Sequence, residues 1–120
     1  MPVETDLFTA IYNATVAQTG NRIYRKKAPA VATAPYITFE QQGGSTLNSV
    51  DGSILDKHNG RFLVSVWATS YDSAIAISRL IAPAMIAATS MNAEPSSEPI
   101  ADEDFDTGLY GIRQYFDVWY

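Results

Sequence analysis

Residue types that carry most enzyme and metal chemistry are sparse in this chain. The 120 residues include one histidine, His58, and no cysteine. A general base or a metal site needs a second group beside the first, and the usual metal ligands are His, Cys, Asp and Glu. His58 lies between Lys57 and Asn59 in a polar stretch. We therefore expect a solvated loop histidine without a catalytic role.

Six carboxylates gather late in the chain, with no Lys or Arg between Arg79 and Arg113. They are Glu94, Glu98, Asp102, Glu103, Asp104 and Asp106. Asp102, Asp104 and Asp106 occupy alternate positions, and Gly108 follows them. The calcium-loop pattern Asp-x-[Asp/Asn]-x-[Asp/Asn]-Gly is nevertheless absent. The twelfth position counted from Asp102 is Arg113, where a calcium loop has Glu. These departures favour a solvated acidic loop over a metal site.

A small basic patch lies near the N-terminus and could hold a nucleic-acid backbone weakly. It consists of Arg22, Arg25, Lys26 and Lys27. The net charge of −5 argues against general affinity for phosphates, and Gly43-Gly44-Ser45-Thr46 lacks the P-loop pattern. We therefore predict that the chain is not an enzyme and has no catalytic, cofactor-binding or metal-binding residue. A small adaptor or nucleic-acid-binding module that uses Arg22–Lys27 stays open as an alternative, and a metal-dependent enzyme is a weaker one.

The composition predicts one domain that spans residues 1–120. Apolar residues make up 47% of the chain, which is enough for a core, and charged residues only 18%. A free monomer often has a surface that is about 25–35% charged. The low charged fraction fits a subunit that buries surface against other copies of the chain. It also fits a monomer with few surface charges. No apolar run is long enough to cross a membrane, and no signal peptide is recognisable. We expect synthesis in the cytoplasm and no membrane partner.

Periodicity predicts two helices. The first covers residues 5–19, with Leu7, Ile11, Ala14 and Gln18 on one face, and Gly20 ends it. The second follows Ser70, a good N-cap. Its predicted buried stripe consists of Ala74, Ile77, Ile81, Ala84, Met85 and Ala88. Pro83 lies inside this helix and predicts a kink or a break there.

Strands are predicted at 22–25, 36–42, 61–68 and 109–119. Strand 61–68 is largely apolar on both faces, which indicates a central strand covered on both sides. Trp67 and Trp119 are expected in the core or in an interface. Residues 89–107 are rich in Ser, Pro and acids and are expected to be irregular, with at most a short strand near Glu98–Ile100. The predicted fold is α+β, a small and mainly antiparallel sheet of about four strands with two helices packed against it.

Residues 43–60 form either an 18-residue loop or a ragged hairpin arm between two predicted strands. A loop of this length in a small domain usually has a function. We predict that it contacts another copy of the chain. Its apolar residues are the candidate interface: Leu47, Val50, Ile54 and Leu55.

The ordered set of elements resembles the tail completion, or tail terminator, proteins of long-tailed bacteriophages and prophages. The likeness covers about residues 5–119. An N-terminal helix is followed by a proline-led strand, Pro35-Tyr-Ile-Thr-Phe39. A strand-to-helix junction comes next, Val64-Ser-Val-Trp-Ala-Thr-Ser-Tyr-Asp-Ser-Ala74, and the closing strand is Gln114-Tyr-Phe-Asp-Val-Trp119.

This resemblance implies a virion structural protein synthesised in the host bacterial cytoplasm. Such proteins form a ring, typically of six subunits, that caps the tail tube and joins it to the head-completion or connector protein. It also implies a place at the head-proximal end of the tail, and passage of DNA through the ring without specific binding. Like charges on the channel wall would keep phosphates from sticking. The candidate channel-lining residues are Asp102, Glu103, Asp104 and Asp106.

Overall fold

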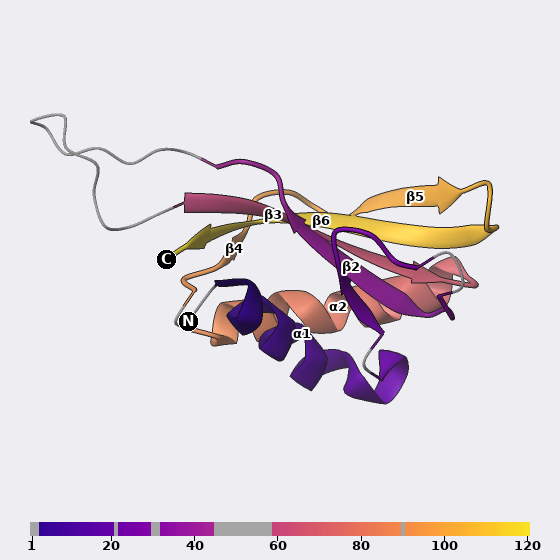
Figure 1. Cartoon of the computed structure of the whole chain (residues 1–120), viewed down its shortest axis with the longest axis horizontal. Helices are drawn as coiled ribbons and strands as arrows, with labels where there is room; N and C mark the ends of the chain where they lie inside the picture. Colours follow the sequence, from indigo (N-terminus) through magenta and orange to yellow (C-terminus); the bar gives the residue numbers. More distant parts are fainter. Residues whose placement is uncertain (1–2, 21, 30–31, 45–58, 90) are drawn as a thin grey trace, which may run out of the picture.

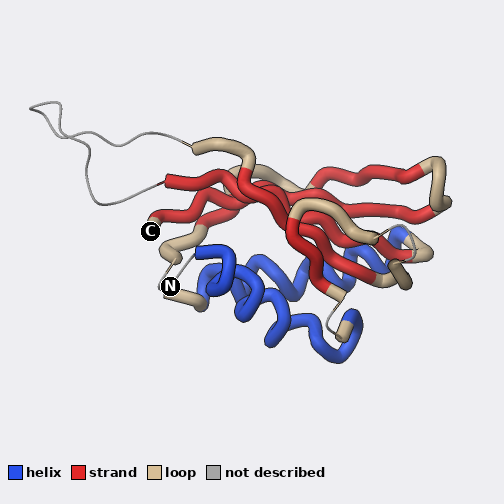
Figure 2. The backbone as a smooth tube through the Cα atoms, in the orientation of Figure 1, coloured by secondary structure: helices blue, strands red, loops and turns tan. Residues whose placement is uncertain are grey.

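Two helices cover one face of a single mixed sheet in the computed structural model of the chain (Figures 1 and 2). The structure describes residues 3–20, 22–29, 32–44, 59–89 and 91–120. The helices are α1 (Val3–Thr19) and α2 (Tyr71–Ala87). The strands are β1 (Ile23–Arg25), β2 (Tyr36–Gln41), β3 (Asn59–Ala68), β4 (Glu94–Pro95), β5 (Ile100–Asp104) and β6 (Leu109–Trp119). The predicted α+β class is confirmed.

The sheet has the strand order β1-β2-β3-β6-β4, and β5 also pairs with β6. Only β1 and β2 run parallel; the other pairs are antiparallel. The sheet therefore has six strands where about four were expected. The two extra strands, β4 and β5, lie within residues 89–107, which were predicted to be irregular. The eleven residues of β6 offer a long edge, and β4 and β5 pair along it one after the other in spite of their low β-propensity.

Helix α1 buries Leu7 and Ile11 as predicted, but the rest of its buried stripe differs from the prediction. Thr15 and Thr19 are fully buried in line with Ile11, whereas Ala14 is half-buried and Gln18 is exposed. The hydroxyl of Thr15 donates to the Ile11 carbonyl at 2.7 Å, and the hydroxyl of Thr19 donates to the Thr15 carbonyl at 3.2 Å. Buried hydroxyls are tolerated when they are hydrogen-bonded. The carbonyls of the helix itself accept these hydrogen bonds. The prediction left Thr15 and Thr19 out of the buried stripe because their side chains are polar.

Helix α2 begins after Ser70 as predicted, and four of the six predicted stripe residues are buried; Ala84 and Ala88 are only half-buried. The hydroxyl oxygen of Ser70 caps the helix by accepting from the Ser73 N–H at 3.2 Å. The buried positions are Ala74, Ile77, Ser78, Ile81 and Met85. Pro83 is exposed, and the helix continues past it to Ala87. The expected break is therefore not observed.

Alternation along β3 divides the sheet into a helix face and an open face. Phe62, Val64 and Val66 face the helices within the main core. Leu63, Ser65 and Trp67 point to the other side, which no helix covers (Figure 1). Strand 61–68 was expected to be covered on both sides, and the described helices cover only one of them. Leu63 and Ser65 are nevertheless only 3% and 4% exposed, because neighbouring strands flank them with side chains of their own.

Trp67 lies on the open face over a glycine. A Cβ atom built on Gly111, its cross-strand partner, would lie 2.7 Å from the indole ring. The ring therefore rests on bare backbone. Both Trp67 and Trp119 are partly exposed, so neither is fully buried in the core, and a place in an interface stays a prediction.

Alanine substitutions should separate the two faces of β3. Phe62 is 0% exposed, so Phe62→Ala should lower the free energy of unfolding by about 3–5 kcal/mol. Trp67→Ala should cost less, about 2 kcal/mol, because the ring buries only part of its surface. Urea denaturation measures both values.

The matched control is Ile86→Ala, because Ile86 is 54% exposed on α2 and surface changes usually stay within about 0.5 kcal/mol. If Trp67→Ala lowered the free energy of unfolding as much as Phe62→Ala does, the assignment of Trp67 to a half-covered face would be contradicted.

Candidate functional site

The described residues offer no arrangement for metal or acid–base chemistry. Among them, no group of three His, Cys, Asp or Glu side chains is placed to hold a metal ion. His58 lies outside the described residues. Within that same part of the chain, no helix is both long and apolar enough to span a membrane. The features that stand out are a groove and a turn on the open face of the sheet.

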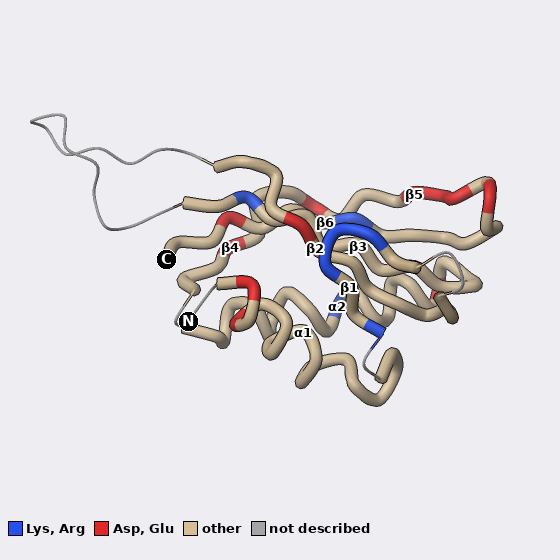
Figure 3. The backbone as a smooth tube through the Cα atoms, viewed as in Figure 1, with Lys and Arg blue, Asp and Glu red and all other residues tan. Residues whose placement is uncertain are grey.

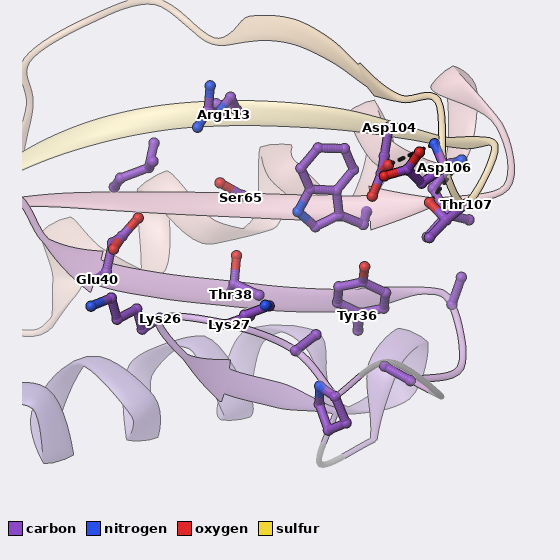
Figure 4. Close-up of a pocket in the computed structure, with 17 residues that line it drawn as sticks. Lys26, Lys27, Tyr36, Thr38, Glu40, Ser65, Asp104, Asp106, Thr107 and Arg113 are labelled. Carbon is purple, nitrogen blue, oxygen red and sulfur yellow. Dashed lines mark hydrogen bonds between the residues drawn. The ribbon is translucent and has the colours of Figure 1, made fainter.

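A groove of about 560 Å³ runs across the open face (Figure 4). Its floor consists of side chains from the central strands, among them Thr38, Ser65 and Trp67. One wall is the segment after β1, which contributes Lys26, Lys27, Ala28, Pro29, Ala32 and Ala34. The opposite wall is the turn between β5 and β6, which contributes Asp104, Asp106, Thr107 and Leu109. The first wall is therefore basic at Lys26 and Lys27, with Glu40 beside Lys26, and the second is acidic at Asp104 and Asp106; Arg113 also lines the groove and pairs with Asp102 (Figure 4).

The basic wall turns away from β1 through a constrained backbone. Lys26 has a φ of 69°, in the left-handed region that non-glycine residues seldom occupy. The Lys26 N–H donates to the Phe39 carbonyl at 2.7 Å, and the Lys27 N–H donates to the Arg25 carbonyl at 2.8 Å. These bonds direct the chain across the open face and carry both lysines to the groove (Figure 4).

The four charges of the predicted basic patch do not act together. Arg22 has a partner within the chain, since its Nε donates to the Pro35 carbonyl at 3.0 Å. Arg25 lies 3.8 Å from the carboxylate of Glu4. Within the described part of the chain, no carboxylate pairs with Lys26 or Lys27. Two lysines are thus the free cations of this region.

The acidic segment has a local cation that the sequence order concealed. The guanidinium of Arg113 lies 3.3 Å from the carboxylate of Asp102. Strand pairing sets Asp102 opposite Gly111, which places Arg113 two residues along on the same face. The expectation that these carboxylates lack local cations is therefore wrong for Asp102.

Strand alternation also separates the four candidate channel-lining residues. Asp102 and Asp104 point to the open face, but Glu103 lies on the helix face, where it accepts a hydrogen bond from the Tyr71 hydroxyl at 3.5 Å. Desolvation, followed by the charge of Glu103, raises the pKa of Tyr71. Asp106 lies in the turn beyond β5. Figure 3 shows the acidic positions following β5 and the turn, and they do not form one uniform lining.

The β5–β6 turn holds the most exposed large apolar side chain that the structure describes. Phe105 is 89% exposed at this turn. The turn itself is braced: the Asp106 N–H donates to the Asp104 carboxylate at 3.0 Å, and the Gly108 N–H donates to the Asp104 carbonyl at 2.8 Å. Gly108 has a φ of 72°, which glycine adopts without strain. Sequence reasoning missed Phe105, although a lone aromatic residue among acids just before a glycine was the available signal.

Tyr36 places a polar group on the groove floor within the electrostatic influence of Asp104. Tyr36 lies on β2 and faces the groove (Figure 4). Burial raises the pKa of its hydroxyl, and the negative charge of Asp104 adds to that effect, as does Tyr24. The phenol therefore stays neutral at physiological pH and remains a hydrogen-bond donor at the groove floor.

The predicted interface residues Leu47, Val50, Ile54 and Leu55 lie outside the described residues. Their role as a contact between copies stays a prediction. The strands on either side of residues 45–58 are described: the Gln42 N–H donates to the Arg61 carbonyl at 2.6 Å, and the Arg61 N–H donates to the Gly43 carbonyl at 3.0 Å. The ends of that segment are therefore held side by side.

Comparison with known proteins points to phage tails. The sequence model of one family, described as "Tail completion protein gp17", matches residues 7–120. No curated protein matches the chain. Among solved structures, a chain of "Virion of native gene transfer agent (GTA) particle" matches with a TM-score of 0.67 and 14% sequence identity, over 98% of this chain and 96% of that chain. Identity this low shows the shared fold alone.

The family match covers nearly every element that positions the groove and the turn, from α1 to β6. It also agrees with the resemblance that the order of elements indicated. The chain therefore belongs to the tail completion protein gp17 family, whose members are structural proteins of phage tails.

Proposed function

We propose that this chain forms a ring that caps the tail tube and joins it to the head connector. The observation that carries the proposal is the family match over residues 7–120. The fold shared with a chain of a gene transfer agent virion supports a place in a particle. The ring has six copies of the chain and lies at the head-proximal end of the tail.

The described surface suits a subunit of a larger assembly. The open face keeps a groove with charged walls, and the partly exposed Trp67 lies on its floor. The sheet ends in two different edges, β1 on one side and β4 with β5 on the other. Contacts between two different surfaces of identical subunits generate closed rings when the rotation closes. This geometry supports a head-to-tail ring.

The proposed partners are neighbouring copies of the chain, the tail tube protein, and a head-completion or connector protein. DNA passes through the ring without specific binding. The channel-lining role proposed for Asp102, Glu103, Asp104 and Asp106 now rests on the last two, because Asp102 pairs with Arg113 and Glu103 accepts from Tyr71.

The adaptor or nucleic-acid-binding alternative has less support from the described residues. Only Lys26 and Lys27 of the basic patch lack an internal partner there, and two free cations hold a phosphate backbone weakly. A measurable, salt-sensitive affinity for duplex DNA that Lys26→Glu and Lys27→Glu together abolish would favour that alternative. Stabilisation by a divalent cation would favour the metal-dependent enzyme.

The ring is tested by the mass of the protein in solution and by electron microscopy. We expect ring-shaped particles of the purified protein, and tails of uncontrolled length in phage assembled without it. A protein that stays monomeric at every accessible concentration, together with normal tails in its absence, would contradict the proposed function.

A second prediction concerns residues 45–58, the proposed contact segment. Replacing them with Asn-Gly should leave a folded domain, because a two-residue turn suits strand ends that already lie side by side. The backbones of Gly44 and Asn59 are close enough that a Cβ on Gly44 would overlap the Asn59 carbonyl. We expect an unchanged unfolding midpoint in circular dichroism and weaker self-association in sedimentation velocity.

The matched control keeps the length of the segment and removes only its apolar side chains. It replaces Leu47, Val50, Ile54 and Leu55 with Ser. Both variants should lose association to a similar degree. If the two variants form rings at the same concentration as the unaltered chain, residues 45–58 are not the contact.

A further inference from the structure

We propose that the β5–β6 turn of one subunit docks into the groove of the next subunit, with Phe105 against the wall that Lys26 and Lys27 form. This inference rests on the proposed ring and names the contact that would build it. The occupant of the groove is a second copy of this chain.

Phe105 has the properties of an interface anchor. It is 89% exposed, while the other exposed large apolar residues, such as Ile86 and Ile100, are 54% and 48% exposed. A fully exposed phenyl ring gains nothing for its own subunit, and aromatic side chains dominate the energetics of many interfaces. The hydrogen bonds of the turn hold the backbone that carries Phe105, so docking would have to order the side chain but not the turn.

The basic wall of the groove matches that anchor in shape and polarity. Its small apolar side chains come from Ala28, Pro29, Ala32 and Ala34. They leave room for a ring in a groove of about 560 Å³. Lys26 and Lys27 stand beside them (Figure 4), where they can meet the aspartates on either side of an incoming Phe105.

Charge complementarity favours a neighbour over a contact within one subunit. Asp104 and Asp106 line the same groove as the two lysines, yet from the opposite wall. In the described part of one chain, no ion pair joins the two walls. The charges of Lys26 and Lys27 and those of Asp104 and Asp106 are therefore available to pair with another copy of the chain. A contact between unlike surfaces of two copies leaves both copies with one free end, which is the condition for a ring.

The first test is Phe105→Ala, measured by sedimentation velocity over a range of concentrations. Loss of an interface anchor should raise the dissociation constant of the subunit contact about tenfold or more. Ile86→Ala is the matched control, since it removes an exposed apolar side chain from α2. The control should assemble like the unaltered chain, and circular dichroism should show the same fold in both variants.

The second test reverses the charges of each wall. One variant has Lys26→Glu and Lys27→Glu, so both of its docking surfaces are acidic. The other has Asp104→Lys and Asp106→Lys, so both are basic. Each variant alone should stay monomeric at concentrations where the unaltered chain forms rings. An equimolar mixture should assemble again, because every contact in an alternating ring then joins opposite charges, and the assembly should weaken as salt is raised. Arg79→Glu, an exposed change on α2, reverses one charge away from the groove and should assemble like the unaltered chain.

The outcomes separate this inference from the proposed function. If the unaltered chain forms rings and these variants form them equally well, the docking contact is wrong and the ring stands. If the unaltered chain never forms rings, the proposed function is wrong, and the docking contact that rests on it is wrong as well.

The third test replaces Asp104 and Asp106 with Asn, which removes both negative charges. Weaker rings support the docking contact. Intact rings with reduced DNA ejection from assembled particles would overturn it and support the channel-lining role instead.

Discussion

The antiparallel pairing of β3 with β6 is the constraint on which the rest of the structure depends. It runs from Asn59 opposite Trp119 to Ala68 opposite Tyr110, and it brings the middle of the chain to its C-terminal segment. The pairing sets Phe62 opposite Phe116 and Val66 opposite Ile112, all on the face that α1 and α2 cover. A shift of one residue would turn these side chains to the open face, so burial of the core holds the register.

The same pairing creates the surface to which we assign function. Because β6 is longer than any other strand, its outer edge accepts β4 and β5, and the turn after β5 carries Phe105 to the end of the sheet. Because the helices cover one face only, the side chains of Leu63, Ser65 and Trp67 become the floor of a groove. The core thus lies on one face of the sheet, and the proposed assembly surface lies on the other.

Local signals in the sequence predicted much of the fold. Alternating apolar residues located the central strands, Ser70 marked the start of α2, and Gly20 marked the end of α1, where its φ of 59° and a hydrogen bond to the Val16 carbonyl close the helix. The errors came where tertiary context overrides local preference. Thr15 and Thr19 are buried because α1 supplies their acceptors, and β5 forms from charged residues because β6 offers it an edge.

Periodicity, capping and the order of elements were enough to predict the α+β class, the two helices, the main strands and the resemblance to phage tail proteins. Which charges lack an ion-pair partner became clear from the folded chain. Arg113 pairs with Asp102, and Arg22 binds the Pro35 carbonyl, whereas Lys26 and Lys27 line the same groove as Asp104 and Asp106 without pairing with them. Spacing along a chain could not reveal this, because ion pairing depends on strand register and on the face to which each side chain points.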